Sequence, residues 1–210
     1  MIFFVYNYYM FNSEICAVPG CNVIRVTGSK TCYEHIADKN VFETNILDLL
    51  KNREKFLDIN LTRFPLKNIS IENKRFYSCK FSGAVLTNVK FINCYFRQCF
   101  FDYSQFKNCK FIDTNIKFTC FAGSVFNKCN IESSDILHTN FNGIKSNNFT
   151  INESDLYFSG FISSSLNNTI FHDCNLKKVN FFQSTRKNVS FKNSNYEDAF
   201  FDKWDKVEET

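Results

Sequence analysis

The sequence has little of what marks an enzyme or a membrane protein. Only 6 of its 210 residues are glycine, and they build no glycine-rich phosphate-binding loop of either common type. It has 3 histidines, and its many Ser and Asp residues do not converge with them in a Ser-His-Asp pattern. No segment reaches the ~20 consecutive apolar residues of a membrane span. These absences argue against catalysis and against a membrane protein.

The sequence also lacks an excess of charge of one sign. Its 25 Lys and Arg residues oppose 21 Asp and Glu residues, and the formal net charge is +4. A basic surface for nucleic acid would need a clearer positive excess, and an acidic surface that imitates a phosphate backbone would need a negative one. The totals indicate neither class of surface.

What the sequence has instead is a large apolar residue at every fifth position from Phe76 to Phe201. These residues are Phe, Leu, Ile or Tyr, and only Ser146 and Arg186 interrupt the series. Beginning at Cys79, the residue two positions before each of them is small, except at Ile144 and Phe149. A period of five fits neither the 3.6 residues of a helical turn nor the alternation of a flat strand. It indicates a repeat architecture with a phenylalanine-rich core.

Six of the 10 cysteines occupy the small-residue position, where they alternate with Ser, Thr, Ala and Val: Cys79, Cys94, Cys99, Cys109, Cys129 and Cys174. A residue that exchanges with other small residues behaves as a small buried apolar group and not as half of a disulfide. Free thiols are typical of a reducing compartment, so we expect a cytoplasmic protein.

Residues 20 positions apart share features that residues five positions apart do not. One outward column contains Asn88, Asn108, Lys128, Asn148, Asn168 and Asn188, and one core column is Phe at every position from Phe81 to Phe201. Four five-residue sides per coil would place such residues directly above one another. Coils stacked at the strand spacing of about 4.8 Å would bond through backbone groups and Asn ladders. The sequence therefore predicts an all-β, four-sided solenoid of about six to seven coils.

Several five-residue units resemble the pentapeptide-repeat family, whose motif is a small residue, then Asn or Asp, then Leu or Phe, then two variable residues. Units 109–113, 114–118 and 134–138 carry the resemblance, which covers residues 76–203. It implies a right-handed quadrilateral β-helix. The fold serves unrelated roles, so it says little about function. Some members protect DNA gyrase from quinolones by imitating duplex DNA with an acidic rod, but this rod is nearly neutral.

Three cysteines and a histidine before the repeats have the spacing of a metal site. Cys16 and Cys21 flank Pro19-Gly20, which can form a tight turn, and Cys32 and His35 follow ten residues later. Such a C-x4-C, C-x2-H set fits tetrahedral zinc, and four protein ligands would make the ion structural. The segment is similar to short zinc knuckles attached to some phage and bacterial nucleases. The alternative is three unligated thiols and an unrelated histidine.

We divide the chain into four segments. Residues 1–38 should hold an N-terminal edge strand, formed by residues 1–11, and the zinc-knuckle-like module. Residues 39–60 have apolar side chains at helical spacing and should form a helix that caps the first coil, since a bare solenoid end exposes strand edges and core. Residues 61–204 should form the solenoid and residues 205–210 a charged tail, with Trp204 closing the last coil.

One side of the predicted solenoid, centred on Ile116, Ile136 and Leu156, carries apolar residues at outward positions. These are Phe118, Leu137, His138, Tyr157 and Phe158, whereas the Asn-rich side has Lys107, Asn127, Asn147, Asn167 and Lys187. A contiguous apolar patch often marks a binding site, so we interpret it as a surface for a protein partner or a second copy. The alternative is that these side chains lie under the N-terminal module or lean along the sheet.

The two interruptions of the apolar series should have local structural consequences. We expect Ile144 to fill the space that Ser146 vacates. We expect the solenoid side to open or bulge near Arg186, because an unpaired buried charge is very costly.

The sequence as a whole favours a non-enzymatic interaction scaffold that binds a protein through the solenoid surface. One alternative is a DNA-imitating protector of DNA gyrase or topoisomerase. Another is a nucleic-acid-associated protein that contacts DNA or RNA through the zinc module, although only Arg25 and Lys30 oppose Glu34 there. A homodimer through a solenoid end or through the apolar patch also remains open.

Overall fold

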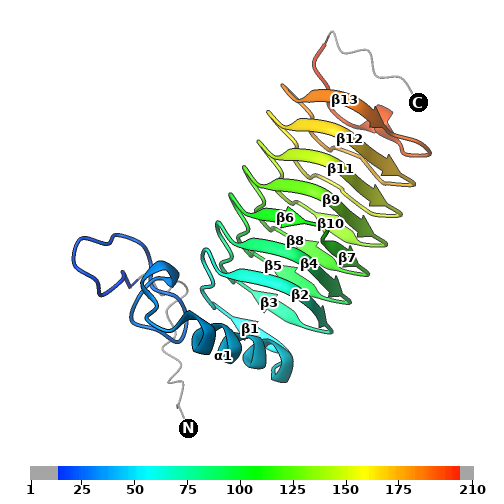
Figure 1. Ribbon diagram of the computed structural model, residues 1–210. Coiled ribbons are helices and arrows are strands. Elements are labelled where there is room, and N and C mark those ends of the chain that lie inside the picture. Colours follow the sequence, from blue (N-terminus) through cyan, green and yellow to red (C-terminus); the bar gives the residue numbers. More distant parts are fainter. Residues whose placement is uncertain (1–13, 204–210) are drawn as a thin grey trace.

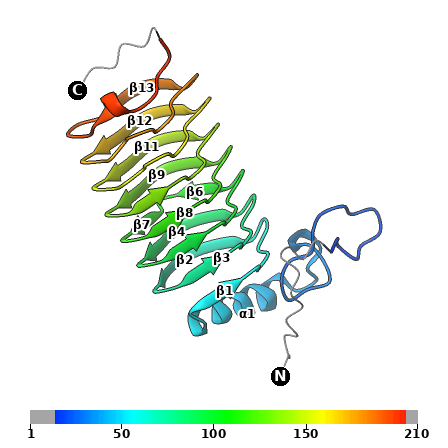
Figure 2. The same ribbon diagram turned by 180° about the vertical axis from the view of Figure 1, so that it is seen from behind.

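Parallel strands that recur every 20 residues build a rod in the computed structural model, which describes residues 14–203 (Figures 1 and 2). Side A of the rod carries short strands, namely β1 (Lys55–Leu57), β3 (Arg75–Tyr77), β5 (Tyr95–Arg97), β8 (Asn115–Lys117) and β10 (Asp135–Leu137). Side B is joined by isolated parallel bridges that run from Asn60 through Lys80 to Phe200.

Sides C and D share the larger sheet. Its strands are β2 (Pro65–Glu72), β4 (Val85–Ile92), β6 (Gln105–Lys107), β7 (Lys110–Ile112), β9 (Val125–Glu132), β11 (Lys145–Asn152), β12 (Ser165–His172) and β13 (Thr185–Ser190). The long strands turn the corner between the two sides. In the coil that holds β6 and β7, the two sides are separate strands, and both pair with β4 and β9.

Every described pairing within the rod joins residues 20 positions apart, as in Phe56 with Phe76 and Ile116 with Ile136. The rod has about seven turns. The predicted closure of the coil after four five-residue sides is therefore confirmed, and so is the fold class, a β-solenoid with a small N-terminal cap.

The corners of the coil explain the period of five. From Phe56 to Phe191, the backbone is left-handed at the second position after each central residue of the five-residue series, and the non-glycine residues there have φ between 47° and 61°. Asparagine and glycine tolerate this conformation best. The Asn column occupies one such corner, where the side-chain amide of Asn88 donates to Asn68 at 2.7 Å and that of Asn108 donates to Asn88 at 3.0 Å. The predicted Asn ladder is therefore confirmed at these coils.

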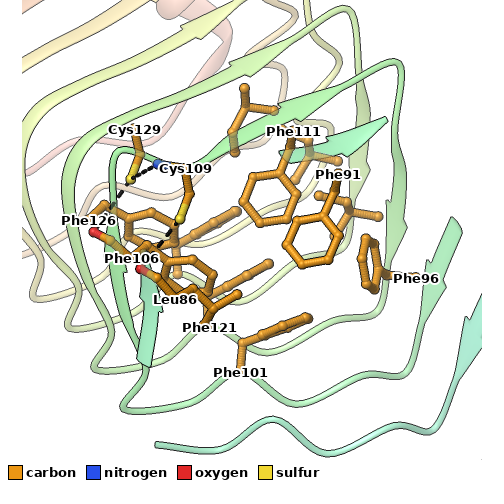
Figure 3. Close-up of a cluster of buried hydrophobic side chains, with 14 of the residues drawn as sticks. Leu86, Phe91, Phe96, Phe101, Phe106, Cys109, Phe111, Phe121, Phe126 and Cys129 are labelled. Atoms are coloured by element: carbon orange, nitrogen blue, oxygen red, sulfur yellow. Dashed lines mark hydrogen bonds between the residues drawn. The ribbon is translucent and has the colours of Figure 1, made fainter. Parts of the chain in front are cut away.

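Phenylalanine rings stack along the axis of the rod. On side B the ring of Phe121 is 5.1 Å from that of Phe101 and 5.0 Å from that of Phe141, nearly parallel to both. Rings from neighbouring sides meet edge to face, as Phe76 and Phe81 do. Each buried ring thus contacts the coils above and below as well as its own coil (Figure 3).

The small position has a hydrogen-bonding role that accounts for its Cys, Ser and Thr residues. The thiols of Cys109 and Cys129 donate to the carbonyl oxygens of Leu86 and Phe106, each 23 residues earlier (Figure 3). The other four cysteines of this position do the same, and so do Ser104, Ser124, Thr139, Ser159, Ser164 and Ser194. A small side chain with a donor thus satisfies a carbonyl of the preceding coil while leaving room for the phenylalanine rings.

The two interruptions are accommodated differently from the expectation. The buried ring of Phe149 stacks on Phe126 at 4.7 Å, so the ring of Phe149, and not Ile144, covers the ring below Ser146. Arg186 lies in the last coil and is half-buried, with its guanidinium 5.0 Å from the ring of Phe201. Strand β13 keeps its register with β12 there, so the predicted bulge is absent. Within residues 14–203, no further coil encloses the charge at this end of the rod.

The helix that covers the first coil is shorter than predicted. Helix α1 spans Lys39–Asn52, and the side chain of Asp38 caps it by accepting from the backbone N–H of Val41. Helix α1 lies at the end of the rod (Figure 1), where its residues Ile46 and Leu50 join the core. Residues 55–57, predicted as helix, instead form β1, because pairing Phe56 with Phe76 extends the sheet and the stacked core by one coil. The solenoid therefore begins before residue 61.

The Cys/His segment bonds to the first coil on side B. The backbone N–H of Thr27 donates to the carbonyl of Asn60, and the hydroxyl of Thr27 accepts from the N–H of Asn60. The amide of Asn60 donates to the carbonyl of Arg25. These contacts fill the edge that a preceding coil would occupy, as a solenoid cap must.

The predicted edge strand in residues 1–11, Trp204 and the tail 205–210 lie outside the described residues. Among residues 14–203, no helix is long and apolar enough to cross a membrane.

We expect Phe121→Ala to lower the free energy of unfolding by about 3–5 kcal/mol, because the lost ring leaves a cavity between two stacked neighbours. Phe201→Ala is the matched control, since Phe201 is half-exposed and stacks on one side, against Phe181. Equilibrium denaturation of both variants measures the difference. Equal losses at the two positions would contradict the stacked-core account.

Candidate functional site

Two short backbone turns bring the four sequence-predicted ligands together. Around Pro19-Gly20 the N–H of Cys21 donates to the carbonyl of Val18, with Gly20 in the left-handed conformation. The single-turn 3-10 helix η1 (Tyr33–His35) then places His35 beside Cys32. Each turn supplies two of the four ligand atoms.

The distances between these atoms fit a tetrahedral ion. His35 Nδ1 lies 3.3 Å from Cys16 Sγ and 3.4 Å from Cys32 Sγ, and the Sγ atoms of Cys21 and Cys32 are 3.9 Å apart. All four ligand atoms lie within 4.8 Å of one another. Zinc bonds of about 2.0–2.3 Å in tetrahedral geometry separate neighbouring ligands by about 3.5–3.8 Å. The four residues therefore form a cluster that could hold a metal ion.

The electrostatics of the cluster differ between its thiols. Burial opposes ionisation of Cys16, but hydrogen bonds from the backbone of Cys32 and Val18 and from the side chains of His35 and Cys21 lower its pKa to about 6. Burial raises the pKa of Cys32. In the rod, burial raises the pKa of Cys94 and Cys174 to about 11. Thiolate is thus favoured at Cys16 and disfavoured at Cys94 and Cys174.

Cys120 also lies outside the small-residue position. It sits at an outward position of side B, half-buried, and burial raises its pKa. It has no part in the metal cluster, which makes it a thiol control for that site.

The second candidate site is the aromatic ridge, which we define as Phe118, Leu137, His138, Tyr157 and Phe158. Phe118, His138 and Phe158 occupy successive coils of the corner between sides A and B. The His138 ring stacks on Phe118 at 5.2 Å and lies 5.2 Å from Phe158 and 5.9 Å from Tyr157. Among residues 14–203, neither the N-terminal module nor any other segment covers the ridge, because Phe118 remains 51% exposed and Phe158 52% exposed.

The backbone conformation at this corner is unfavourable for the phenylalanine residues of the ridge. Phe118 and Phe158 have φ of 54° and 61°, in the left-handed region that bulky residues avoid. A left-handed non-glycine residue costs on the order of 1–3 kcal/mol, and such strain tends to collect at functional positions. The protein thus carries two exposed phenylalanines where asparagine or glycine would be more stable.

Cations lie at both ends of the ridge. The Arg97 guanidinium is 5.9 Å from the Phe118 ring, and Lys178 Nζ is 5.5 Å from the Phe158 ring. Lys117 and Lys177 stand at neighbouring outward positions of side A. Within residues 14–203, none of these four cations forms an ion pair with a carboxylate. Sequence reasoning missed them, although Lys178 lies one coil after Phe158 and Arg97 lies one coil before Lys117.

A shallow acidic groove of about 490 Å³ runs along the opposite edge of side A. It is lined by Asp135, Glu153, Asp155 and Asp173, together with Ser133, Ser134, Ser154 and Asn175. None of the lining residues is Lys or Arg, and the carboxylates accept from neutral donors such as the amides of Asn115 and Asn175. The sequence could have predicted this groove, because Asp135 and Asp155 are 20 residues apart and therefore lie on neighbouring coils.

The two remaining histidines do not share a site. His138 lies in the ridge, whereas His172 is on side D, where its Nδ1 lies 2.7 Å from the Asn152 amide oxygen and 3.0 Å from an Asp173 carboxylate oxygen. In the described part of the chain, neither ring hydrogen-bonds to a serine or cysteine side chain. The arrangement offers metal coordination and surface recognition more readily than nucleophilic chemistry.

Comparison with known proteins identifies the repeats. Residues 79–117 match pentapeptide repeats in eight copies. The solved structure of QnrB1, a plasmid-mediated fluoroquinolone resistance protein, is similar with 15% identity and a TM-score of 0.43 over 69% of this chain and 89% of that one. HetL, a pentapeptide repeat protein involved in heterocyst differentiation regulation from a Nostoc cyanobacterium, has 10% identity and a TM-score of 0.27 over 76% and 96%. No curated protein matches the sequence.

We expect the purified protein to contain one metal ion per chain. Cys21→Ser should lose the ion because it removes one of four ligands, whereas Cys120→Ser should retain it. Elemental mass spectrometry of the two variants and the parent measures the metal content. Equal metal content in the parent and Cys21→Ser would rule out the site.

Proposed function

Because the solenoid of this chain is built from pentapeptide repeats, we propose that the protein is a non-enzymatic interaction scaffold that binds a protein partner through the aromatic ridge. The observation that carries the proposal is the pair Phe118 and Phe158, exposed at corner positions where their backbone is strained. Exposed apolar patches and stored strain both tend to mark recognition sites.

The rod suits recognition better than catalysis. Its interior is filled by stacked rings, so a substrate would have to bind on the outside. The ridge offers four aromatic rings, three of them at successive corners whose spacing is set by the stacked coils, on a backbone bonded to the coils on both sides. A rigid surface binds with little loss of conformational entropy.

We assign the Cys/His cluster a structural zinc ion. Three thiolates and an imidazole are ligands that zinc prefers, and four protein ligands leave no open position for a substrate. The bonds from Thr27 and Arg25 to Asn60 connect this module to the first coil. Metal binding would therefore order the cap. The described cysteines form no disulfide, which agrees with a reducing, cytoplasmic environment.

The described residues give less support to the two alternative functions. Imitation of DNA would call for a continuous acidic surface, whereas side D carries Lys90 and Lys110 in register. A nucleic-acid contact through the metal module would call for basic residues there, and Arg25 is paired with Glu14 at 2.9 Å. The ridge remains the best-supported interface.

We expect the double variant Phe118→Asn and Phe158→Asn to lose partner binding without losing stability. Asparagine relieves the left-handed strain of about 1–2 kcal/mol per residue, which offsets the lost ring contacts of about 0.5–1.5 kcal/mol each. Tyr103→Asn is the matched control, because Tyr103 is an exposed aromatic residue at φ 56° on another corner.

The measurement is quantitative affinity capture from the native host with the parent, the double variant and the control as baits, alongside denaturation of each. A protein retained by the parent and by Tyr103→Asn but lost from the double variant is the expected result. Identical captured proteins for all three baits would show that the ridge is not the interface.

A further inference from the structure

Side A joins two surfaces of different chemistry between its corners. One corner is the aromatic ridge, and the other edge is the acidic groove formed by Asp135, Glu153, Asp155 and Asp173. Leu137 and Tyr157, at outward positions one coil apart, are the ridge residues next to the groove. The surface of side A therefore changes from carboxylate to apolar side chains across the five residues of one side.

The backbone of side A is not available to a partner in the middle of the rod. Asp135 pairs with Asn115 on one side and with Asp155 on the other, and Asp155 pairs further with Asn175. A partner strand could not add to these coils, because their ladder groups are already bonded. Recognition at side A must use side chains.

The dimensions of side A match a helix that lies along the rod. Five residues at about 3.3 Å each make a side no wider than about 17 Å, against a helix diameter of about 10–12 Å. The four coil steps from Arg97 to Lys177 span about 19 Å, the length of about 13 helical residues. Such a helix would contact the groove with one flank and the ridge with its apolar face.

Charge fixes which helix fits. The four groove carboxylates have no Lys or Arg partner within the described residues, so they would pair with cations on the helix. The cations Arg97, Lys117, Lys177 and Lys178 stand at the two ends of the site and would repel further positive charge there. The complementary occupant has an apolar strip and a short basic row beside its middle turns.

We propose that side A binds an amphipathic helix of a partner protein, with the apolar face of the helix on the aromatic ridge and a row of Lys or Arg residues in the groove of Asp135, Glu153, Asp155 and Asp173. This inference rests on the proposed function and specifies the partner of the same ridge. The helix axis runs along the rod.

Two designed peptides test the proposal. Both are 18-residue helices with the same leucine strip and otherwise neutral residues, and three positions at intervals of four beside the strip carry Lys in one peptide and Glu in the other. Fluorescence anisotropy with the full-length protein measures both affinities. We expect the Lys peptide to bind at least about tenfold more tightly, with the preference falling as salt is added.

The triple variant Asp135→Asn, Glu153→Gln, Asp155→Asn should reduce this preference to less than about threefold. Its fold should be intact, because Asn115 and Asn175 occupy the same column as Asp135 and Asp155, and Asn175 accepts from the N–H of Lys177 as Asp155 accepts from that of Tyr157. The double variant Phe118→Asn and Phe158→Asn should bind neither peptide.

The other outcomes distinguish failure of the helix proposal from failure of the ridge as an interface. Equal binding of both peptides, or an unchanged preference in the triple variant, overturns the basic helix while leaving the ridge as an interface. Absence of binding by either peptide also overturns the helix. Loss of the ridge itself as an interface is decided separately, by the host capture experiment.

Discussion

A left-handed residue at every fifth position is the constraint on which the rest of the structure depends. It turns the chain through each corner, and four such corners close the coil after 20 residues. Closure puts like residues above like, so phenylalanine rings stack, Asn side chains form ladders, and small donors meet the carbonyl groups of the preceding coil. Each of these contacts forms because the corners recur at exact intervals of five residues along the rod.

The same constraint turns the outer surface into columns. The left-handed backbone of a corner is least unfavourable for Asn or Gly. Large aromatic residues at three successive corners therefore lower the stability of the protein, and packing of the core does not require them. The neighbouring columns then set the character of each side. On side A they place carboxylates along one edge, aromatic rings along the other and cations at both ends, and this combination is what makes the side a candidate interface.

The sequence predicted the solenoid because its period is fixed by backbone geometry and is repeated many times. It also predicted the grouping of Cys16, Cys21, Cys32 and His35, since ligand spacing follows from two local turns. It was wrong about Lys55–Leu57, where helical spacing and the five-residue period overlap and only pairing with the next coil decides the outcome. It did not reveal that Phe118 and Phe158 sit at strained corners, because φ is a property of the closed coil. The stacking of the Phe149 ring on Phe126, at the place where Ser146 has no large side chain, depends on packing between coils. No local sequence pattern predicts it.

The cap completes the account, because an unfinished first coil would expose a strand edge and the rings of Phe56 and Phe64. Helix α1 covers these rings and the Cys/His segment bonds to the edge, so that stacking can begin. The closure of the coil is tested most directly by deletion. Removal of residues 84–103, one whole coil, joins Gly83 to Ser104 with every column in phase, whereas removal of residues 84–93 stacks unlike columns. Denaturation should show a cooperative β-protein of nearly parental stability for the first deletion and a much less stable protein for the second. Equal stability of the two deletion variants would contradict a coil that closes after 20 residues.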